Sequence, residues 1–400
     1  MPSPTTATER SATRAIAFLA LAGFASQSMV RVTDSLLPQI AGDFGITVGA
    51  AAVAVWAYAL AHGSVQLVIG PVGDRFGKYI CVAAATAAAA VLVALCGLAE
   101  SLPALVIARL AVGFAAGWVI PLGMAFLGDV VPYQHRQRVL GRFLSGQIIG
   151  QLFGQAAGGV LGDLFGWRNV FFILAVLFAI ASAALWIEYA RNAVTRANHA
   201  LATRSRGFVT DYKTVLGSPW ARTVIFFGFL ENGMMFGAFA YVGAYLHLRF
   251  GLSLSFVGLL VGAFAVGGLI YSMSVGALIA RLGQAKFAIC GGALLALGFT
   301  TLALTSYWQT TPLSVVVIGF GFYMLHNTLQ TNITEATPQA RGTAVATFSA
   351  AIYFGQMLFV SIGAWMFDRH GGQSVFVAAG ILLVATGAMY ARVLALRLKA

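Results

Sequence analysis

Three ionisable residues, Asp34, Arg109 and Glu231, stand inside segments that are otherwise apolar. A charge in an apolar environment is unfavourable unless it is paired, so such residues often belong to an ion or substrate pathway. A carboxyl group can take up and release a proton, and a guanidinium can balance the charge that results. We therefore predict that these three residues serve proton coupling.

Asp34 admits two arrangements. Gln27, Arg31 and Asp34 are spaced by four and three residues, which places them on one face of a helix. In the first arrangement, Asp34 faces Arg109 across a cavity, and protonation of Asp34 changes that pairing. In the second, Asp34 pairs with Arg31 one turn away, and Arg109 donates hydrogen bonds to backbone carbonyls. Glu231 likewise either exchanges protons or holds a neighbouring helix through a hydrogen bond.

Further polar side chains recur at helical spacing within the apolar segments. Polar groups need partners in lipid, so lining a hydrated central cavity is the simplest arrangement, although each residue could instead bridge two helices. The predicted cavity residues are Gln27, Arg31, His62, Gln147, Gln151, Asn232, His326, Asn327, Gln330, Tyr353 and Gln356.

The sequence offers no constellation for covalent or metal catalysis. It contains no Ser–His–Asp arrangement, HExxH motif or Cys/His cluster, and its three cysteines lie far apart in apolar runs. It also contains no P-loop, which argues against ATP-driven pumping. We expect neither an enzyme nor a bound metal or cofactor. A sensor would be expected to carry a large soluble part, so transport is favoured over sensing.

The segments that position these residues have the composition of membrane helices. Of the 400 residues, 60% are hydrophobic and 9% are charged, whereas soluble domains carry about 25% charged residues. Apolar stretches of the ~20 residues that span a bilayer recur along the chain. They predict an all-α polytopic membrane protein with twelve helices, at 14–37, 48–69, 80–99, 104–128, 139–161, 168–189, 221–246, 253–275, 286–306, 312–334, 342–365 and 373–394.

Basic residues are distributed unequally between alternate loops. Of the 24 lysines and arginines, 19 fall in the two tails and the loops on their side, and three fall in the other loops, at Arg168, Arg249 and Arg369. By the positive-inside rule, both termini are expected in the cytoplasm. The protein itself is expected in the cell (inner) membrane. The net charge of +12 is expected to face anionic lipid headgroups, and no nucleic-acid binding is expected.

The chain repeats itself. A polar stretch at 191–219 separates two halves, so we predict an N-terminal six-helix half (1–190), a cytoplasmic linker (191–219) and a C-terminal six-helix half (220–400). A shift of 205 residues matches Gln151 with Gln356 and Asp163 with Asp368, and a shift of 206 matches Phe44-Gly45 with Phe250-Gly251. Parallel halves of this kind predict a substrate site between them, near the middle of the membrane.

The loop GPVGDRFGK, at 70–78, resembles the signature loop of the major facilitator superfamily, G-x-x-x-D-R-x-G-[RK]. The resemblance implies the major facilitator fold and a loop that acts as a latch in the outward-open state; a basic turn is the alternative. The second-half copy has Ala280 in place of the acid. The latch residues implied are Gly70, Asp74, Arg75, Gly77, Gly276, Arg281 and Gly283.

Residues 141–159 read G-x8-G-x3-G-Q-x2-G-G, which resembles the antiporter signature of that family with Gln155 in place of a proline. Asp34 followed by Pro38 is similar to the end of helix 1 in drug–proton antiporters. These likenesses point to the drug:proton antiporter branch. Small residues let helices approach closely, and the glycines concerned are Gly150, Gly154, Gly158 and Gly159.

The function predicted is secondary active transport, namely proton-coupled efflux of small organic or drug-like molecules by alternating access. The alternative is proton-coupled uptake or facilitated transport of an organic anion, sugar or polyol, because Arg31 and Arg109 could clamp an anionic group. The expected partners are the small-molecule substrate, protons and membrane lipid, and the chain is expected to act as a monomer.

Overall fold

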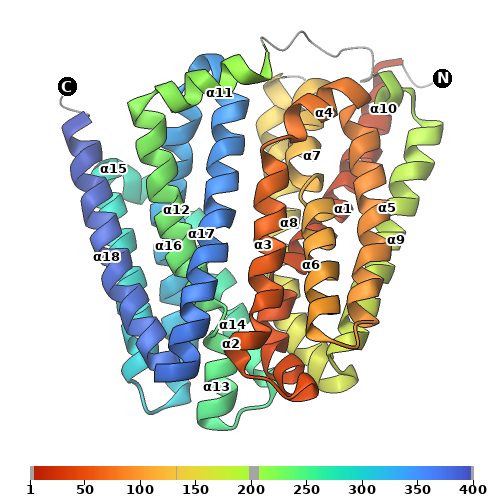
Figure 1. The fold of residues 1–400 in the computed structure, drawn as a ribbon. Helices are drawn as coiled ribbons and strands as arrows, with labels where there is room; N and C mark the ends of the chain where they lie inside the picture. The colour runs from red at the N-terminus through yellow and green to blue at the C-terminus, as the bar shows by residue number, and fades with distance from the viewer. Residues whose placement is uncertain (1–3, 132, 198–206, 398–400) are drawn as a thin grey trace.

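The computed structural model describes residues 4–131, 133–197 and 207–397, and within these ranges helices account for nearly the whole chain (Figure 1). The first group of helices is α1 (Pro4–Phe44), α2 (Val48–Ala51), α3 (Val53–Gln66), α4 (Ile69–Phe76), α5 (Lys78–Gly97), α6 (Leu102–Ala116), α7 (Val119–Val130), α8 (Tyr133–Phe165) and α9 (Trp167–Arg191). Two short helices follow, α10 (Ala193–Ala197) and α11 (Phe208–Gly217).

The second group is α12 (Pro219–Phe239), α13 (Val242–Phe250), α14 (Leu254–Gly262), α15 (Phe264–Leu304), α16 (Thr311–Ala336), α17 (Arg341–His370) and α18 (Gly372–Arg397). Short 3₁₀ turns, η1 (Trp308–Thr310) and η2 (Pro338–Ala340), precede α16 and α17. We call α1–α9 the N bundle and α12–α18 the C bundle. They stand side by side in Figure 1, with both chain ends at one face together with α4, α10 and α11. That face is the terminal face, and α2, α13 and α14 lie at the opposite face.

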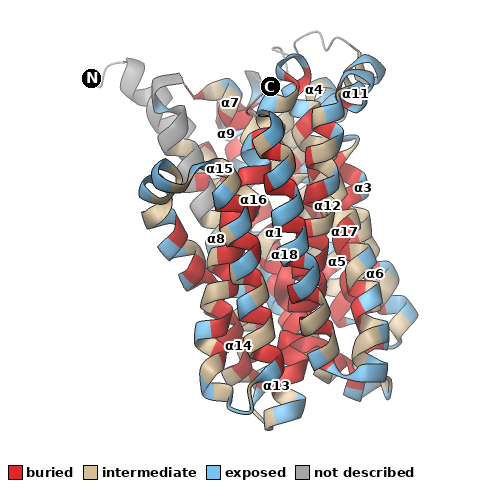
Figure 2. Ribbon diagram, turned by 90° about the vertical axis from the view of Figure 1, so that its left-hand side faces the viewer, coloured by how far each residue is buried: buried red, intermediate tan, exposed pale blue. Residues whose placement is uncertain are grey.

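The structure confirms the predicted fold class. Ten stretches of the described chain are long and apolar enough to cross a membrane. One of them, Leu254–Leu304, holds two of the predicted helices, because Gly283 (φ 70°, ψ 163°) interrupts α15. Helix α8 covers the predicted span 139–161. Together these segments account for the twelve predicted helices. Their outward sides expose large apolar residues such as Ile107, Val176 and Leu259, as expected for surfaces in contact with lipid. Figure 2 shows exposed segments in pale blue alternating with buried red ones along the helices.

The predicted first helix, 14–37, is too short at both ends, because α1 already begins at Pro4. Helix α1 does not end at residue 37 but continues to Phe44 with Pro38 inside it. Proline lacks the N–H that would bond to the carbonyl one turn earlier. Contacts with α8 support the helix on both sides of this gap, because Ser35 Oγ donates to the Gln155 carbonyl (2.8 Å) and Gln39 Nε2 donates to the Gly162 carbonyl (2.7 Å).

Candidate functional site

Asp34 pairs with Arg31 on the same helix. Arg31 Nη1 lies 3.5 Å from Asp34 Oδ2, and the two residues are 2% and 4% exposed. Neither carboxylate oxygen accepts a hydrogen bond. The contact is therefore a long ion pair, and the acceptor positions of Asp34 remain unused.

Arg109, from α6, is held by backbone carbonyls. Its Nε donates to the Ala54 carbonyl (3.0 Å) and its Nη1 donates to the Met29 carbonyl (3.4 Å). The guanidinium also lies 4.4 Å from the centroid of the Tyr58 ring, a favourable position for a cation. Asp34 and Arg109 form no direct ion pair, so the structure shows the second of the two arrangements that the sequence allowed.

A hydrogen-bonded chain joins Arg31 to the C bundle. Arg31 Nη2 donates to Gln356 Oε1 on α17 (3.0 Å), and Gln356 Nε2 donates to Asn232 Oδ1 on α12 (2.6 Å). The Arg31 guanidinium also lies 3.5 Å from the ring centroid of Phe236. Among the hydrogen bonds between the bundles of the described chain, Arg31–Gln356 is the one in which both side chains are buried.

Glu231 lies beside Asn232 and pairs with a different helix. Its Oε2 lies 3.1 Å from His326 Nδ1 on α16, while its Oε1 has no hydrogen-bond partner. The Glu231 residue is fully buried, and the His326 side chain is 14% exposed. The His326 ring stacks on Phe322 with centroids 4.9 Å apart. This carboxyl thus bridges two helices and still keeps one free acceptor.

The other predicted cavity residues are less connected. His62 packs its ring against Tyr353 across the two bundles, with centroids 4.3 Å apart, and its Nδ1 lacks a partner. Gln147 is buried, Gln27, Gln151 and Asn327 are partly exposed, and Gln330 is exposed. The four central charged residues are each at most 4% exposed; they are Arg31, Asp34, Arg109 and Glu231. The described residues contain no group of three or more His, Cys, Asp or Glu that could hold a metal ion.

Two carboxylates connect the bundles by hydrogen bonds at the opposite face, and we call these contacts the Asp163 and Asp368 clasps. Asp163, near the end of α8, accepts hydrogen bonds from Ser255 N (3.0 Å) and Ser255 Oγ (2.8 Å) in α14. Asp368, near the end of α17, accepts from Thr47 Oγ1 (2.6 Å) and Gly49 N (2.9 Å) beside α2. Sequence reasoning matched Asp163 with Asp368 as repeat partners but gave them no role. Their match in register was the signal that could have identified this pair of contacts.

The glycines of α8 divide between two surfaces. A Cβ on Gly150, Gly154 or Gly158 would lie 2.2–2.8 Å from a carbonyl oxygen of α1, inside the N bundle. A Cβ on Gly159 would instead lie 2.4 Å from the Leu254 carbonyl at the start of α14, in the C bundle. Gly159 is therefore the member of the motif that permits close contact between the bundles.

The predicted latch residues gather at the terminal face. Asp74 lies 3.3 Å from Lys78, which also pairs with Asp129, so these charges are satisfied inside the N bundle. Lys78 is thus the ion-pair partner of Asp74. Arg75 and Arg281 are exposed, and neither forms an ion pair in the described chain. In this state the loop holds no contact with the C bundle through these charges.

Positive φ angles explain two of the latch glycines. Gly77 (φ 97°) and Gly283 (φ 70°) end equivalent turns in the two bundles, in a conformation that other residues rarely adopt. A Cβ on Gly70 or Gly276 would meet nothing within 4 Å, so space does not require glycine at these positions.

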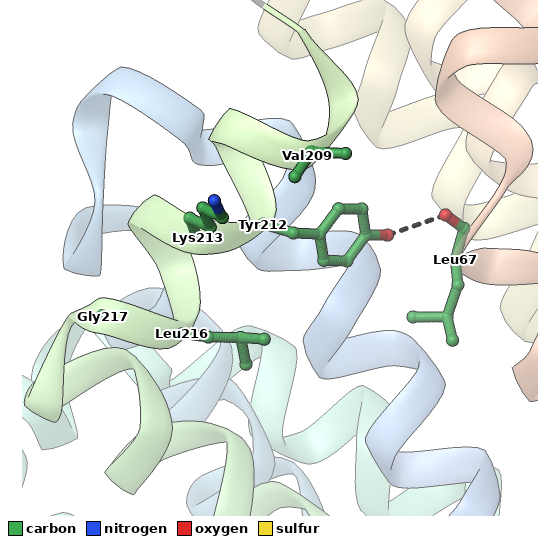
Figure 3. A pocket seen from close by; sticks show the side chains of 6 residues that line it. All are labelled: Leu67, Val209, Tyr212, Lys213, Leu216 and Gly217. Atoms are coloured by element: carbon green, nitrogen blue, oxygen red, sulfur yellow. Dashed lines mark hydrogen bonds between the residues drawn. The ribbon is translucent and has the colours of Figure 1, made fainter.

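Helix α11 makes a separate contact at the terminal face. Tyr212 Oη donates to the Leu67 carbonyl at the end of α3 (2.8 Å), beside a shallow pocket (Figure 3). The pocket is lined by Leu67, Val209, Tyr212, Lys213, Leu216 and Gly217. None of the central charged residues lines it, so it lies apart from the candidate site.

Comparisons with known proteins agree with this architecture. The family model of the Major Facilitator Superfamily matches residues 19–255 and 232–399. An uncharacterized transporter of Buchnera aphidicola is 25% identical over 95% of this chain and 90% of its own length. A bacterial homologue of the human lysosomal transporter Spinster, solved inward-facing and unoccupied, has a similar fold (TM-score 0.71, 16% identity, 98% and 96% of the two chains). The nucleoside transporter NupG is also similar in fold (TM-score 0.76, 14% identity, 93% and 98%).

Proposed function

Since the chain belongs to the major facilitator superfamily, we propose that it is a secondary active transporter that exchanges protons for small organic or drug-like molecules by alternating access. One observation carries the proposal: each bundle buries one central carboxyl that keeps a free acceptor, Asp34 in the N bundle and Glu231 in the C bundle. Such a group can gain a proton without breaking a hydrogen bond. Arg31 and His326 stand beside the two carboxyls and respond to that change.

The contacts between the bundles support an inward-facing assignment. With residues 1–190 and 220–400 as the moving halves, 191–219 as the linker and both termini in the cytoplasm, the opposite face is the outer face of the cell membrane. The Asp163 and Asp368 clasps close that face. The latch loop, which the family engages in the outward-open state, pairs here within its own bundle. Transport then requires the two clasps to break as the latch forms.

The surroundings of Glu231 favour a substrate with an apolar ring and a hydrogen-bond donor or cation. His326 stacks on Phe322 and lies 5.9 Å, between centroids, from the ring of Phe348. Aromatic faces bind flat apolar groups and attract cations, and the free Glu231 oxygen can accept from a donor. These features support efflux of drug-like compounds.

The second candidate function, uptake of an organic anion, sugar or polyol, also has a supporting observation. Arg31 Nε and Arg109 Nη2 are buried and lack partners, so each guanidinium keeps a donor for an anionic group. A substrate panel must therefore contain both cations and anions.

The test is flux in proteoliposomes of the purified protein under an imposed pH gradient. Asp34→Asn and Glu231→Gln should each abolish gradient-driven accumulation, while counterflow of substrate without a gradient persists. Asp43→Asn is the matched control, because Asp43 lies on the same helix but is exposed and pairs with Arg168 near the opposite face. Normal gradient-driven transport by both core variants would refute proton coupling at these carboxyls.

A further inference from the structure

Arg31 is shared between two bundles. Among the described residues of the N bundle its polar partner is Asp34 at 3.5 Å, whereas in the C bundle it has the 3.0 Å hydrogen bond to Gln356 and the ring of Phe236. All of these residues are at most 5% exposed. A guanidinium that lies between two acceptors binds more strongly to the acceptor with the greater negative charge.

The chemistry of arginine fixes the orientation of the whole chain of hydrogen bonds. A guanidinium only donates, so Gln356 must turn its oxygen toward Arg31 and its Nε2 toward Asn232. Asn232 must then present its own oxygen, as the 2.6 Å contact shows. Gln356 is thus an acceptor for the N bundle and a donor for the C bundle.

We propose that Gln356 is a positioning residue for proton coupling: it transmits the charge state of Asp34 to the C bundle by competing with Asp34 for Arg31. When Asp34 is ionised, it draws Arg31 toward α1 and weakens the Arg31–Gln356 bond. When Asp34 is protonated, the attraction between the two α1 side chains falls, and Arg31 binds Gln356 and Phe236 more strongly. This inference rests on the proposed proton exchange at Asp34.

The competition between Asp34 and Gln356 for Arg31 determines which conformational state proton binding favours. Proton binding at Asp34 strengthens the buried contact between the bundles and favours the state that is closed at the opposite face. Proton loss favours separation of the bundles there. A carrier that gains its proton outside and releases it inside needs this order. The other groups close enough to feel the Asp34 charge are Arg109 on α6 and Tyr241 after α12. Arg109 keeps its backbone carbonyls in either charge state.

The experiment is a double-mutant cycle in which the distance between two spin labels is measured. Spin labels at positions 100 and 307, in the loops that follow α5 and α15 at the opposite face, report whether the bundles are closed there. Wild type, Asp34→Asn, Gln356→Leu and the double variant are compared over a pH series. We expect Asp34→Asn to raise the closed-to-open ratio roughly tenfold, the effect of one charge-assisted hydrogen bond. In the Gln356→Leu background the same change should move the ratio less than about twofold.

Two further variants separate positioning from general packing. Ser361→Ala removes a polar group from the same helix whose hydrogen bond stays within α17, and it should leave the Asp34→Asn shift at tenfold. Gln356→Glu keeps the acceptor for Arg31 but lacks the donor to Asn232, so the Asn232 amide must turn its nitrogen toward the new carboxyl group. When ionised, this carboxylate adds charge beside Arg31, so the variant should favour the closed state, and it serves as the second test if Gln356→Leu fails to fold. An equal Asp34→Asn shift with and without Gln356, or a Gln356→Glu variant that opens, overturns the inference. Flux measured on the same proteins tests the proposed function separately, because an uncoupled transporter can still show the conformational cycle.

Discussion

Replacement of Gly159 by alanine should open the opposite face without damaging either bundle. The added Cβ would lie 2.4 Å from the Leu254 carbonyl, whereas ordinary contact begins at 3.4 Å, so the two backbones must part by about 1 Å. The Asp163–Ser255 hydrogen bonds, at 2.8 and 3.0 Å, lie next to this point and would stretch beyond bonding range.

The expected shift in the closed-to-open ratio follows from the overpacking at Gly159 and the loss of the Asp163–Ser255 hydrogen bonds. Overpacking costs about 1–3 kcal/mol, and hydrogen bonds to a charged group contribute about 1.5–3 kcal/mol. A combined loss of about 3 kcal/mol shifts the closed-to-open ratio by about 100-fold toward the open state. The distance between labels at positions 100 and 307 measures that ratio directly.

Two other glycines of α8 serve as matched controls. Gly154→Ala places its Cβ 2.2 Å from the Ser28 carbonyl inside the N bundle. It should therefore lower thermal stability, while the protein that remains folded keeps the wild-type closed-to-open ratio. Gly146→Ala meets its nearest atom at 3.6 Å and should change neither quantity. If Gly159→Ala kept the wild-type distance, or lost thermal stability as Gly154→Ala should, the assignment of Gly159 to the contact between bundles would be wrong.

Three other perturbations test the same structure. Asp163→Ala and Asp368→Ala each remove two hydrogen bonds across the opposite face, so each should shift the closed-to-open ratio toward open by about 10- to 100-fold, and their effects should add because the clasps share no residue. Arg109→Lys cannot reproduce two hydrogen bonds and a ring contact, so denaturation of the purified protein should show a loss of about 1.5–3 kcal/mol, with no loss refuting the role of the carbonyls. Gly77→Ala and Gly283→Ala force alanine to positive φ and should each lower the free energy of unfolding by about 1–2 kcal/mol, unlike the same change at Gly70.

The spans could be predicted because length and apolarity are properties of one segment at a time. The break at Gly283 separates two predicted helices for the same reason, since glycine is the residue that tolerates its φ angle. The end of α1 could not be predicted from Pro38, because α8 supplies the contacts that hold the helix beyond it.

The partners of the charged residues were also beyond the sequence. Spacing placed Arg31 and Asp34 on one face, and that prediction alone could not decide between Arg31 and Arg109 as the partner of Asp34. Arg109 is instead bound by the backbone carbonyls of Met29 and Ala54. Every residue has a backbone carbonyl, so no sequence pattern identifies the two that accept from Arg109. The contact of Arg31 with Gln356 spans 325 residues, so it arises only when the bundles meet.

The repeat is preserved at the ends of the bundles and lost at the two central carboxyls. Asp163 and Asp368 match in both sequence and contact, and so do the turns at Gly77 and Gly283. At the shift of 206 residues, however, Asp34 corresponds to Ala240 and Glu231 corresponds to Ala25. Two bundles that rock about a common axis need equivalent contacts at their ends, because both must open together. The proposed proton coupling instead uses facing groups that differ, since Asp34 pairs with Arg31 and Glu231 pairs with His326. Symmetric clasps around an asymmetric set of charges fit a proposal in which both bundles open together and one bundle responds to a proton bound in the other.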